Sequence, residues 1–156
     1  MGSKKHKEKI WNLIKNIEVG MINYPSSNGI ISKPLQLIQE SYDNRLWFLV
    51  DRSGTIYEEF KDGKLVSLSF SDISNNIYVS LRGEGYILES EDLIDKFWNN
   101  YVSAWFEKKS DAALIEVRVR HGEHWDVNVS REEFDHEVAN AVNSEETPNV
   151  EEHAVF

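Results

Sequence analysis

The chain has 156 residues, of which 40% are hydrophobic and 12% aromatic, so it is long and apolar enough to fold around one core. Seventeen Lys and Arg against 27 Asp and Glu give a net charge of −10. This balance disfavours a general nucleic-acid surface, because phosphate neutralisation needs clustered cations. The absence of cysteine excludes disulfides, thiolate catalysis and Cys-ligated metals.

The N-terminal segment 4–17 is predicted to be an amphipathic helix. Ile10, Leu13, Ile14 and Ile17 recur at helical spacing, and lysines occupy the opposite face. This interrupted apolar pattern is typical of neither a signal peptide nor a membrane span. We therefore expect a soluble cytoplasmic protein with no membrane partner and no nucleic-acid partner.

Five strands are predicted in the first part of the chain, over residues 19–24, 30–40, 46–51, 65–71 and 77–88. A short helical turn follows the third. Pro34 has no N–H to donate, so the second strand belongs at a sheet edge, a bulge or a place where the sheet opens. Val66, Leu68 and Phe70 alternate strictly with serines, which indicates one buried face. The last three strands form a meander that must close or pair to protect its edges, which favours a small barrel.

The second part of the chain is predicted to begin with a helix capped by Ser90. Its apolar residues lie at helical spacing: Leu93, Ile94, Phe97, Trp98 and Tyr101. Two strands are predicted next, over residues 113–119 and 124–129, joined across His121 and Gly122.

The C-terminal end is strongly acidic. Eight acidic residues follow Ser130 beside one basic residue, whereas the chain up to Ser130 carries 16 basic and 19 acidic side chains. Ser130 and Glu133 have the spacing of a capping box, which predicts a short helix to about Val142 and a tail after it. We therefore divide the chain into a domain over residues 1–130 and an acidic helix and tail over residues 131–156.

No motif identifies a catalytic or metal site by itself. Gly83 and Gly85 lie inside a strand pattern and lack the rest of a dinucleotide fingerprint, so we predict a strand bend or close packing. His121 and His124 fall on opposite faces of a strand, so we predict exposed histidines and no metal site. The sequence contains no nucleophile elbow and no clear acid–base pair of carboxylates, so the catalytic residues stay unknown.

Aromatic residues with two nearby cations are the most informative group. They are Lys33, Trp47, Phe48, Arg52, Tyr78, Trp105, Phe106 and Trp125. Flat aromatic walls beside a positive charge suit a planar anionic ligand. Ordinary barrel packing accounts for the aromatics equally well.

After the N-terminal helix, a series of short motifs follows in a characteristic order. They are Glu18-Val19-Gly20-Met21, Lys33-Pro34-Leu35, Leu46-Trp47-Phe48, Leu68-Ser69-Phe70, Tyr78-Val79-Ser80-Leu81-Arg82-Gly83, Phe97-Trp98, Ala104-Trp105-Phe106 and Glu123-His124-Trp125-Asp126. This order resembles the general stress protein branch of the pyridoxamine 5'-phosphate oxidase-like family. The resemblance implies a mainly β fold with flanking helices (α+β), built on a six-stranded antiparallel split β-barrel of the FMN-binding type. It also implies a homodimer that binds a small molecule at the subunit interface.

The resemblance further implies a set of FMN-binding residues: Lys33, Pro34, Leu35, Val50, Asp51, Arg52, Ser53, Tyr78, Trp105 and Trp125. Lys33 stands where the family usually has arginine, and Val50 where it favours threonine. Gly54-Thr55-Ile56 replaces a Ser-x-Lys pair that usually helps to hold the phosphate. Because a phosphate dianion needs charged donors, we expect weak or partial FMN occupancy.

Two functions remain open from the sequence. The first is a dimeric flavoprotein that carries out redox chemistry on an unidentified small molecule. The second is a non-enzymatic split-barrel dimer that has lost FMN and binds another ligand or none. A haem-handling relative on the same barrel would need a well-placed histidine, for which His121 and His124 are the candidates.

Overall fold

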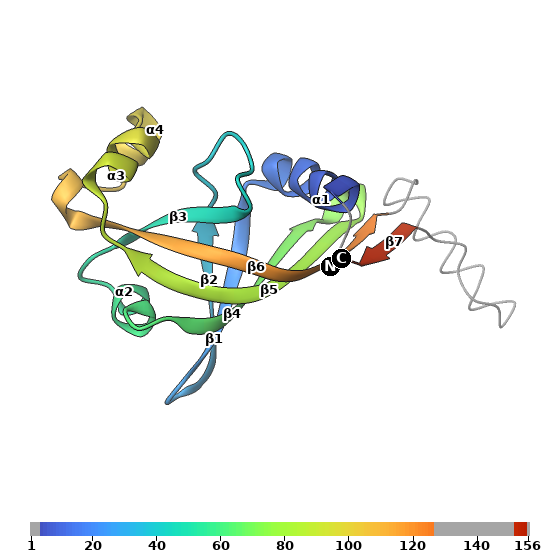
Figure 1. Ribbon diagram of the computed structural model, residues 1–156, viewed down its shortest axis with the longest axis horizontal. Helices are drawn as coiled ribbons and strands as arrows, with labels where there is room; N and C mark the ends of the chain where they lie inside the picture. The colour runs from blue at the N-terminus through green and yellow to red at the C-terminus, as the bar shows by residue number, and fades with distance from the viewer. Residues whose placement is uncertain (1–3, 127–151, 156) are drawn as a thin grey trace, which may run out of the picture.

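A curled antiparallel sheet forms the body of the computed structural model, which describes residues 4–126 and 152–155 (Figure 1). The strands are hydrogen-bonded in the order β2-β1-β4-β5-β6-β3, and β7 pairs with the end of β6. Their bounds are β1 Val19–Ser26, β2 Gly29–Gln36, β3 Arg45–Asp51, β4 Lys64–Asp72, β5 Ile77–Leu88, β6 Ala112–Asp126 and β7 Glu152–Val155. The six-stranded sheet with flanking helices confirms the predicted split-barrel fold.

Helices flank this sheet (Figure 1). They are α1 Lys4–Ile17, α2 Thr55–Phe60, α3 Glu91–Phe97 and α4 Asn100–Ser103, with the 3-10 turns η1 Ile73–Asn75 and η2 Lys109–Asp111. Among the described residues, no helix is long and apolar enough to cross a membrane.

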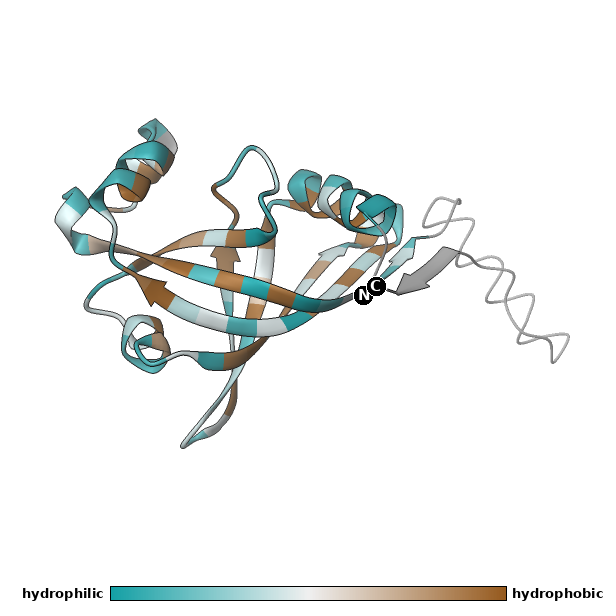
Figure 2. Cartoon of the chain, viewed as in Figure 1, coloured by the Kyte–Doolittle hydropathy of each residue, from teal (hydrophilic) through white to brown (hydrophobic). Residues whose placement is uncertain are grey.

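The main core lies inside the curl of the sheet, under α1. On β4, Val66, Leu68 and Phe70 are 5%, 1% and 1% exposed, so the predicted alternation is confirmed. Figure 2 shows the same alternation as hydrophobic and hydrophilic bands along the strands. Helix α1 adds Ile10 and Ile14 to this core. A second, smaller cluster on the outer face packs α3 against Trp47 of β3.

Three pairing details differ from the sequence prediction. Strand β3 pairs with β6 and not with β4, because α2 carries the chain away from β3 before β4 begins. The two predicted final strands are one strand, β6, for as far as the structure describes them. This strand contains a bulge at Arg120, because Arg82 pairs with His121 whereas the next residue, Gly83, pairs with Val119. The second strand ends at Gln36, four residues before the predicted end.

The predicted helix after Ser90 is also divided in two. Ser90 caps α3 as expected, accepting a hydrogen bond from the N–H of Leu93 at 3.3 Å. Trp98 then adopts extended backbone angles and ends α3. Asn99 accepts a hydrogen bond from the N–H of Val102 at 2.9 Å, and so caps α4 separately.

Other expectations concern single residues or the C-terminal end. Pro34 lies on the edge strand β2, as predicted. Gly83 marks close packing, since a Cβ there would lie 1.9 Å from the carbonyl oxygen of Arg118. The predicted helix to Val142 lies outside the described residues. Within the predicted tail, residues 152–155 form β7.

Candidate functional site

The turn after β3 is held by the Asp51 side chain. Asp51 Oδ1 accepts hydrogen bonds from the N–H and the Oγ of Ser53, both at 2.8 Å. The N–H of Gly54 donates to the carbonyl oxygen of Asp51 at 2.9 Å. These bonds to Ser53 hold the pKa of the Asp51 carboxyl below its usual value of 3.8. The turn therefore carries a fixed negative charge at neutral pH, and the Ser53 hydroxyl is already used within it.

Lys33 brings a positive charge to the same turn from the edge strand β2. Its Nζ donates a hydrogen bond to Oγ1 of Thr55, the first residue of α2. Strands β2 and β3 are not hydrogen-bonded to each other, so this contact spans the split of the barrel. One cation and one hydroxyl thus meet where the edge strand β2 contacts the start of α2, which is an arrangement suited to an anion.

Arg52, by contrast, is bonded to the protein through each of its three guanidinium nitrogens. Its Nε donates to the carbonyl oxygen of Ser110 at 3.1 Å, and its Nη2 donates to that of Ala112 at 3.2 Å. Its Nη1 forms an ion pair with Glu89. Each guanidinium nitrogen therefore already has an acceptor, so Arg52 braces the turn against the start of β6.

Glu89 also accepts a hydrogen bond from the Tyr57 hydroxyl at 2.5 Å. This bond raises the pKa of Tyr57 and lowers that of Glu89, and the nearby Arg52 guanidinium lowers the Glu89 pKa further. The cluster of Arg52, Tyr57 and Glu89 joins α2 to the end of β5.

Several of the predicted residues line a hollow of about 620 Å³ beside this turn. They are Asp51, Arg52, Ser53 and Trp105, together with Phe106, Glu107, Ser110 and Asp111. Trp105 is 71% exposed, so much of its aromatic surface faces the solvent beside this turn. The structure therefore brings Trp105 to the turn that follows β3, although the two are more than fifty positions apart in the chain.

The remaining residues of the predicted phosphate end are oriented differently. Val50 is buried in the main core, and Ile56 joins the same cluster from α2. Leu35 is half-buried against this core, whereas Pro34 is exposed on β2. Val50 and Ile56 therefore fill the interior and have no donor to offer a phosphate.

Tyr78 and Trp125 lie far from this turn in the same chain. They are cross-strand partners at one end of the β5–β6 ladder, whereas Leu88 and Leu114 pair at the other end. Ten residues of strand separate Tyr78 from Leu88, a length of roughly 33 Å. Ala113, next to Leu114, pairs with Val50 of β3, just before the turn. Trp125 is 39% exposed, so one chain presents two separate aromatic surfaces.

Trp47 and Phe48 belong to neither aromatic surface. Trp47 is 3% exposed in the outer cluster and Phe48 is fully buried in the main core. These two aromatics therefore serve packing, which was the alternative explanation from the sequence.

The sequence prediction was wrong for His124, which is 1% exposed. Its Nδ1 lies 2.8 Å from Oδ1 of Asp126, and Lys9 of α1 forms an ion pair with the same carboxylate at 3.1 Å. The spacing of two between His124 and Asp126, which puts both on one face of a strand, was the available signal. His121 is half-buried beside Glu123. Over residues 4–126, no cluster of three or more metal-ligating side chains occurs.

Comparisons with known proteins agree with this architecture. A family model described as pyridoxamine 5'-phosphate oxidase like matches residues 5–149. A general stress protein 26 structure from Jannaschia sp. CCS1 has 20% identity and a TM-score of 0.75, covering 99% of both chains. The general stress FMN/FAD binding protein from Xanthomonas citri has 24% identity and a TM-score of 0.70, covering 80% of this chain and 90% of its own.

A third structure is described as a pyridoxamine 5'-phosphate oxidase-related, FMN binding protein from Nostoc punctiforme PCC 73102. It has 11% identity and a TM-score of 0.62, covering 81% of this chain and 87% of its own. At these identities the three structures establish the fold alone. Among curated protein sequences, no match is found.

Proposed function

Because the chain belongs to the pyridoxamine 5'-phosphate oxidase like family, we propose that it is a homodimer that binds FMN and carries out redox chemistry on a small molecule. The observation that carries the proposal is the meeting of Lys33 and Thr55 at the split between β2 and β3. The printed descriptions of the X. citri and N. punctiforme proteins as flavin-binding support the choice of cofactor.

The phosphate end of the proposed site rests on few donors. Lys33 supplies the charge and Thr55 a hydroxyl, whereas the Arg52 guanidinium is bonded to Ser110 and Ala112. Lysine offers a point charge without the two-pronged geometry of arginine. These residues offer a phosphate fewer charged donors than the family pattern does. We therefore propose that FMN binds weakly.

The ring end requires a second subunit. Trp105 stands beside the turn, whereas Tyr78 and Trp125 lie at the opposite end of the β5–β6 ladder. These three aromatics line one site only if Tyr78 and Trp125 come from the partner subunit. We therefore propose two equivalent sites at the subunit interface of a homodimer.

In this proposal the chemistry of electron or hydride transfer comes from FMN. The residues of the chain bind the phosphate, hold the ring between aromatic walls and keep water away from it. No side chain of the described site is assigned as a catalytic acid or base, and the substrate is an unidentified small molecule.

A second candidate is a split-barrel dimer without flavin. Val50 and Ile56 favour it, because they occupy two expected phosphate-donor positions with buried aliphatic side chains. This candidate has the same fold and the same proposed dimer, and differs only in what the site between subunits contains.

A titration with FMN separates the two candidates. FMN at a hundredfold excess over its dissociation constant should stabilise the folded protein by about 2.7 kcal/mol, which thermal unfolding detects. Riboflavin, which lacks the phosphate, is the matched control and should bind more weakly. A protein that is purified colourless and whose melting temperature and fluorescence do not respond to FMN contradicts the flavin proposal.

A further inference from the structure

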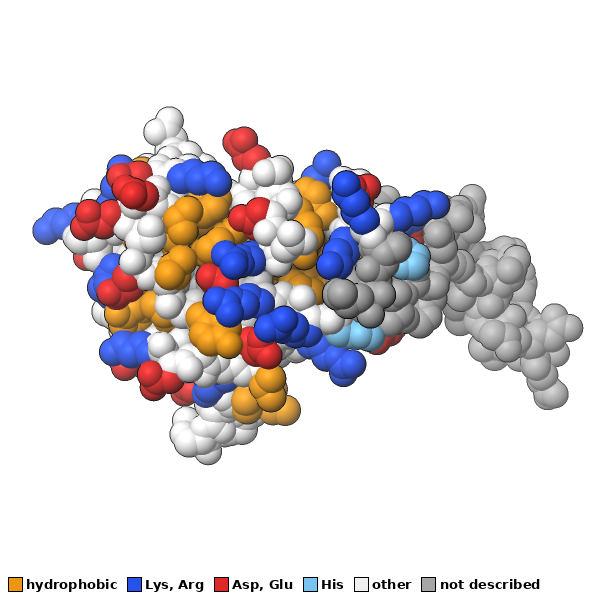
Figure 3. Space-filling view, in the orientation of Figure 1, with side chains coloured by type: hydrophobic (Ala, Val, Ile, Leu, Met, Phe, Trp, Pro, Cys, Tyr) orange, Lys and Arg blue, Asp and Glu red, His pale blue; other side chains and the backbone are white. Residues whose placement is uncertain are grey.

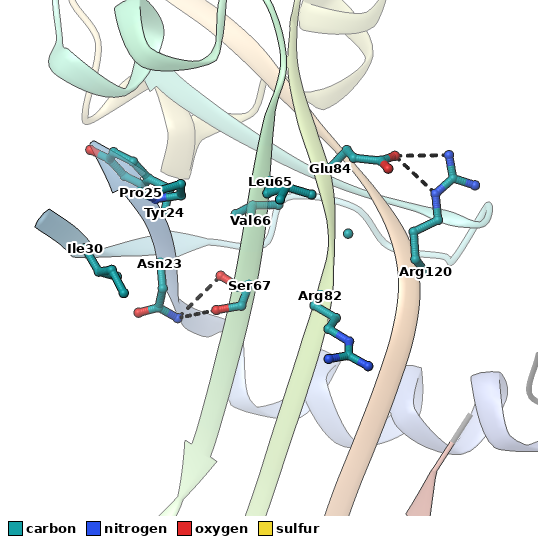
Figure 4. A pocket seen from close by; sticks show the side chains of 11 residues that line it. Asn23, Tyr24, Pro25, Ile30, Leu65, Val66, Ser67, Arg82, Glu84 and Arg120 are labelled. Carbon is teal, nitrogen blue, oxygen red and sulfur yellow. Dashed lines mark hydrogen bonds and ion pairs between the residues drawn. The ribbon is translucent and has the colours of Figure 1, made fainter. Parts of the chain in front are cut away.

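A second hollow lies on the outer face of the sheet, where β1, β4, β5 and β6 pass side by side (Figure 4). Its volume is about 470 Å³, within the range of small-molecule sites. Its lining includes Pro25, Ile30, Leu65, Val66, Arg82 and Arg120. None of its lining residues lines the hollow beside Trp105, so the two hollows are distinct.

One side of this groove is apolar and open to solvent. Ile30 from β2 is 79% exposed and Leu65 from β4 is 68% exposed. Beyond Leu65, the outward positions of β4 are serines, at Ser67, Ser69 and Ser71. The exposed apolar surface of β4 is therefore confined to the groove.

The other side of the groove presents an arginine without a partner. Among the arginines in the described part of the chain, Arg82 alone has no hydrogen bond or ion pair. Arg120 pairs with Glu84 at 3.0 Å, Arg45 and Arg118 pair with Glu116, and Arg52 pairs with Glu89. Figure 4 shows the bonds from Arg120 to Glu84 and none from Arg82. A free guanidinium is best satisfied by a planar anion such as carboxylate.

The pairing of β5 with β6 fixes where Arg82 and Arg120 lie. Arg120 is the extra residue of the β6 bulge, opposite the step from Arg82 to Gly83. Bulges redirect side chains, and they recur next to functional sites. The backbones are in close contact here, since a Cβ on Gly83 would lie 1.9 Å from the carbonyl oxygen of Arg118. Figure 3 shows Lys and Arg side chains in a band across the middle of the face that it draws, with apolar side chains beside them.

We propose that this groove binds an amphipathic monocarboxylate, with the carboxylate on Arg82 and the apolar body on Leu65 and Ile30. A monoanion suits the groove better than a dianion, because the chain as a whole carries a net charge of −10 and repels anions at long range. This inference does not depend on FMN, because the groove shares no residue with the proposed flavin site.

The test uses decanoate as the probe, below its micellar concentration, with decan-1-ol as the uncharged control ligand. Isothermal titration calorimetry compares the wild-type chain with Arg82→Gln, Leu65→Ser and the control Lys15→Gln, which removes an exposed cation from α1. Arg82→Gln should weaken decanoate binding about tenfold or more and leave decan-1-ol binding unchanged, because it removes only the charged contact. Leu65→Ser should weaken the binding of both ligands, and Lys15→Gln should change the binding of neither.

Three results would overturn the proposal. The first is the absence of saturable decanoate binding to the wild-type chain. The second is an equal loss of binding in Arg82→Gln and Lys15→Gln, which would indicate a general charge effect. The third is a change from dimer to monomer in Leu65→Ser by light scattering, which would assign the groove to a contact with a second copy of the chain.

Saturating FMN distinguishes this proposal from the flavin proposal. Decanoate affinity should be the same with and without FMN, and displacement of one by the other would contradict two separate sites. If FMN does not bind at all, the decanoate titrations still stand by themselves.

Discussion

Nη2 of Arg52 lies 3.2 Å from the carbonyl oxygen of Ala112, which ties the turn after β3 to the first residue of β6. Nε forms a second bond, to the carbonyl oxygen of Ser110, and Nη1 forms an ion pair with Glu89. The family resemblance placed Arg52 among the cofactor-binding residues, and its contacts give it a structural role as well: it holds the turn that leads to Thr55, the residue that Lys33 contacts.

The first prediction is that Arg52→Gln lowers the stability of the fold more than it lowers the intrinsic affinity for FMN. Loss of two hydrogen bonds to backbone carbonyls should reduce the free energy of unfolding by about 1–3 kcal/mol, measured by urea denaturation. Lys109→Gln is the control, because it removes an exposed ion pair to Asp95 and should change stability by about 0.5 kcal/mol or less. Unchanged stability together with a large loss of FMN affinity would return Arg52 to the cofactor site.

The second prediction concerns Lys33. Lys33→Ala should weaken FMN binding about tenfold or more, because it removes the cation that contacts Thr55. Riboflavin affinity and the unfolding midpoint should stay close to wild type, and Lys33→Arg should retain FMN binding. An equal loss of affinity for FMN and for riboflavin in Lys33→Ala would mean that this lysine does not face the phosphate.

The third prediction tests whether each site is shared between two subunits. Lys33→Ala and Trp125→Ala homodimers should each bind FMN poorly, whereas a mixture allowed to exchange subunits should regain binding. One site of each mixed dimer then combines an intact Lys33 from one subunit with an intact Trp125 from the other. Fluorescence titration of the mixture checks this, and binding no better than the mean of the two variants would exclude a shared site.

The fourth prediction follows from the lowered pKa of Glu89. Its ordinary value is 4.5, and the bonds from Tyr57 and Arg52 keep the folded-state value below that. The stabilisation is therefore present above about pH 4.5 and is lost as the pH falls through the folded-state pKa. Glu89→Gln should flatten the acid side of a plot of unfolding free energy against pH. An identical slope in wild type and variant would show that Glu89 does not contribute.

The fifth prediction addresses the missing phosphate donors. Ile56→Lys restores the residue type that the family usually has but places an ammonium group at a position that packs in the core. We expect a loss of roughly 2–5 kcal/mol in unfolding free energy, because burial of an unpaired charge is costly. Gly54→Ser is the control: φ at Gly54 is −87°, which any residue adopts, and its Cβ would lie 3.1 Å from the carbonyl oxygen of Asp51, so we expect a smaller loss than in Ile56→Lys. If Ile56→Lys were as stable as wild type, this side chain would face solvent and the site.

Local spacing in the sequence determined much of the fold. The helix over residues 4–17, the strand over residues 77–88 and the cap at Ser90 were predicted with the bounds that the structure has. The buried face of β4 also followed from the sequence, and Pro34 lies at a sheet edge, one of the three positions that the sequence left open. These features depend on periodicity, capping chemistry or a missing N–H, which act within a few residues of the chain.

Only the tertiary structure decided which distant segments meet. The pairing of β3 with β6, the bulge at Arg120 and the bonds from Arg52 to Ser110 and Ala112 all join residues that are far apart in the chain. The burial of His124 depends on a side-chain partner, Asp126, and on α1 packing from the other end of the sequence. The separation of Lys33 from Trp125 follows from the length of the β5–β6 ladder. This ladder forms by pairing between distant segments, which the spacing of residues within either strand does not specify.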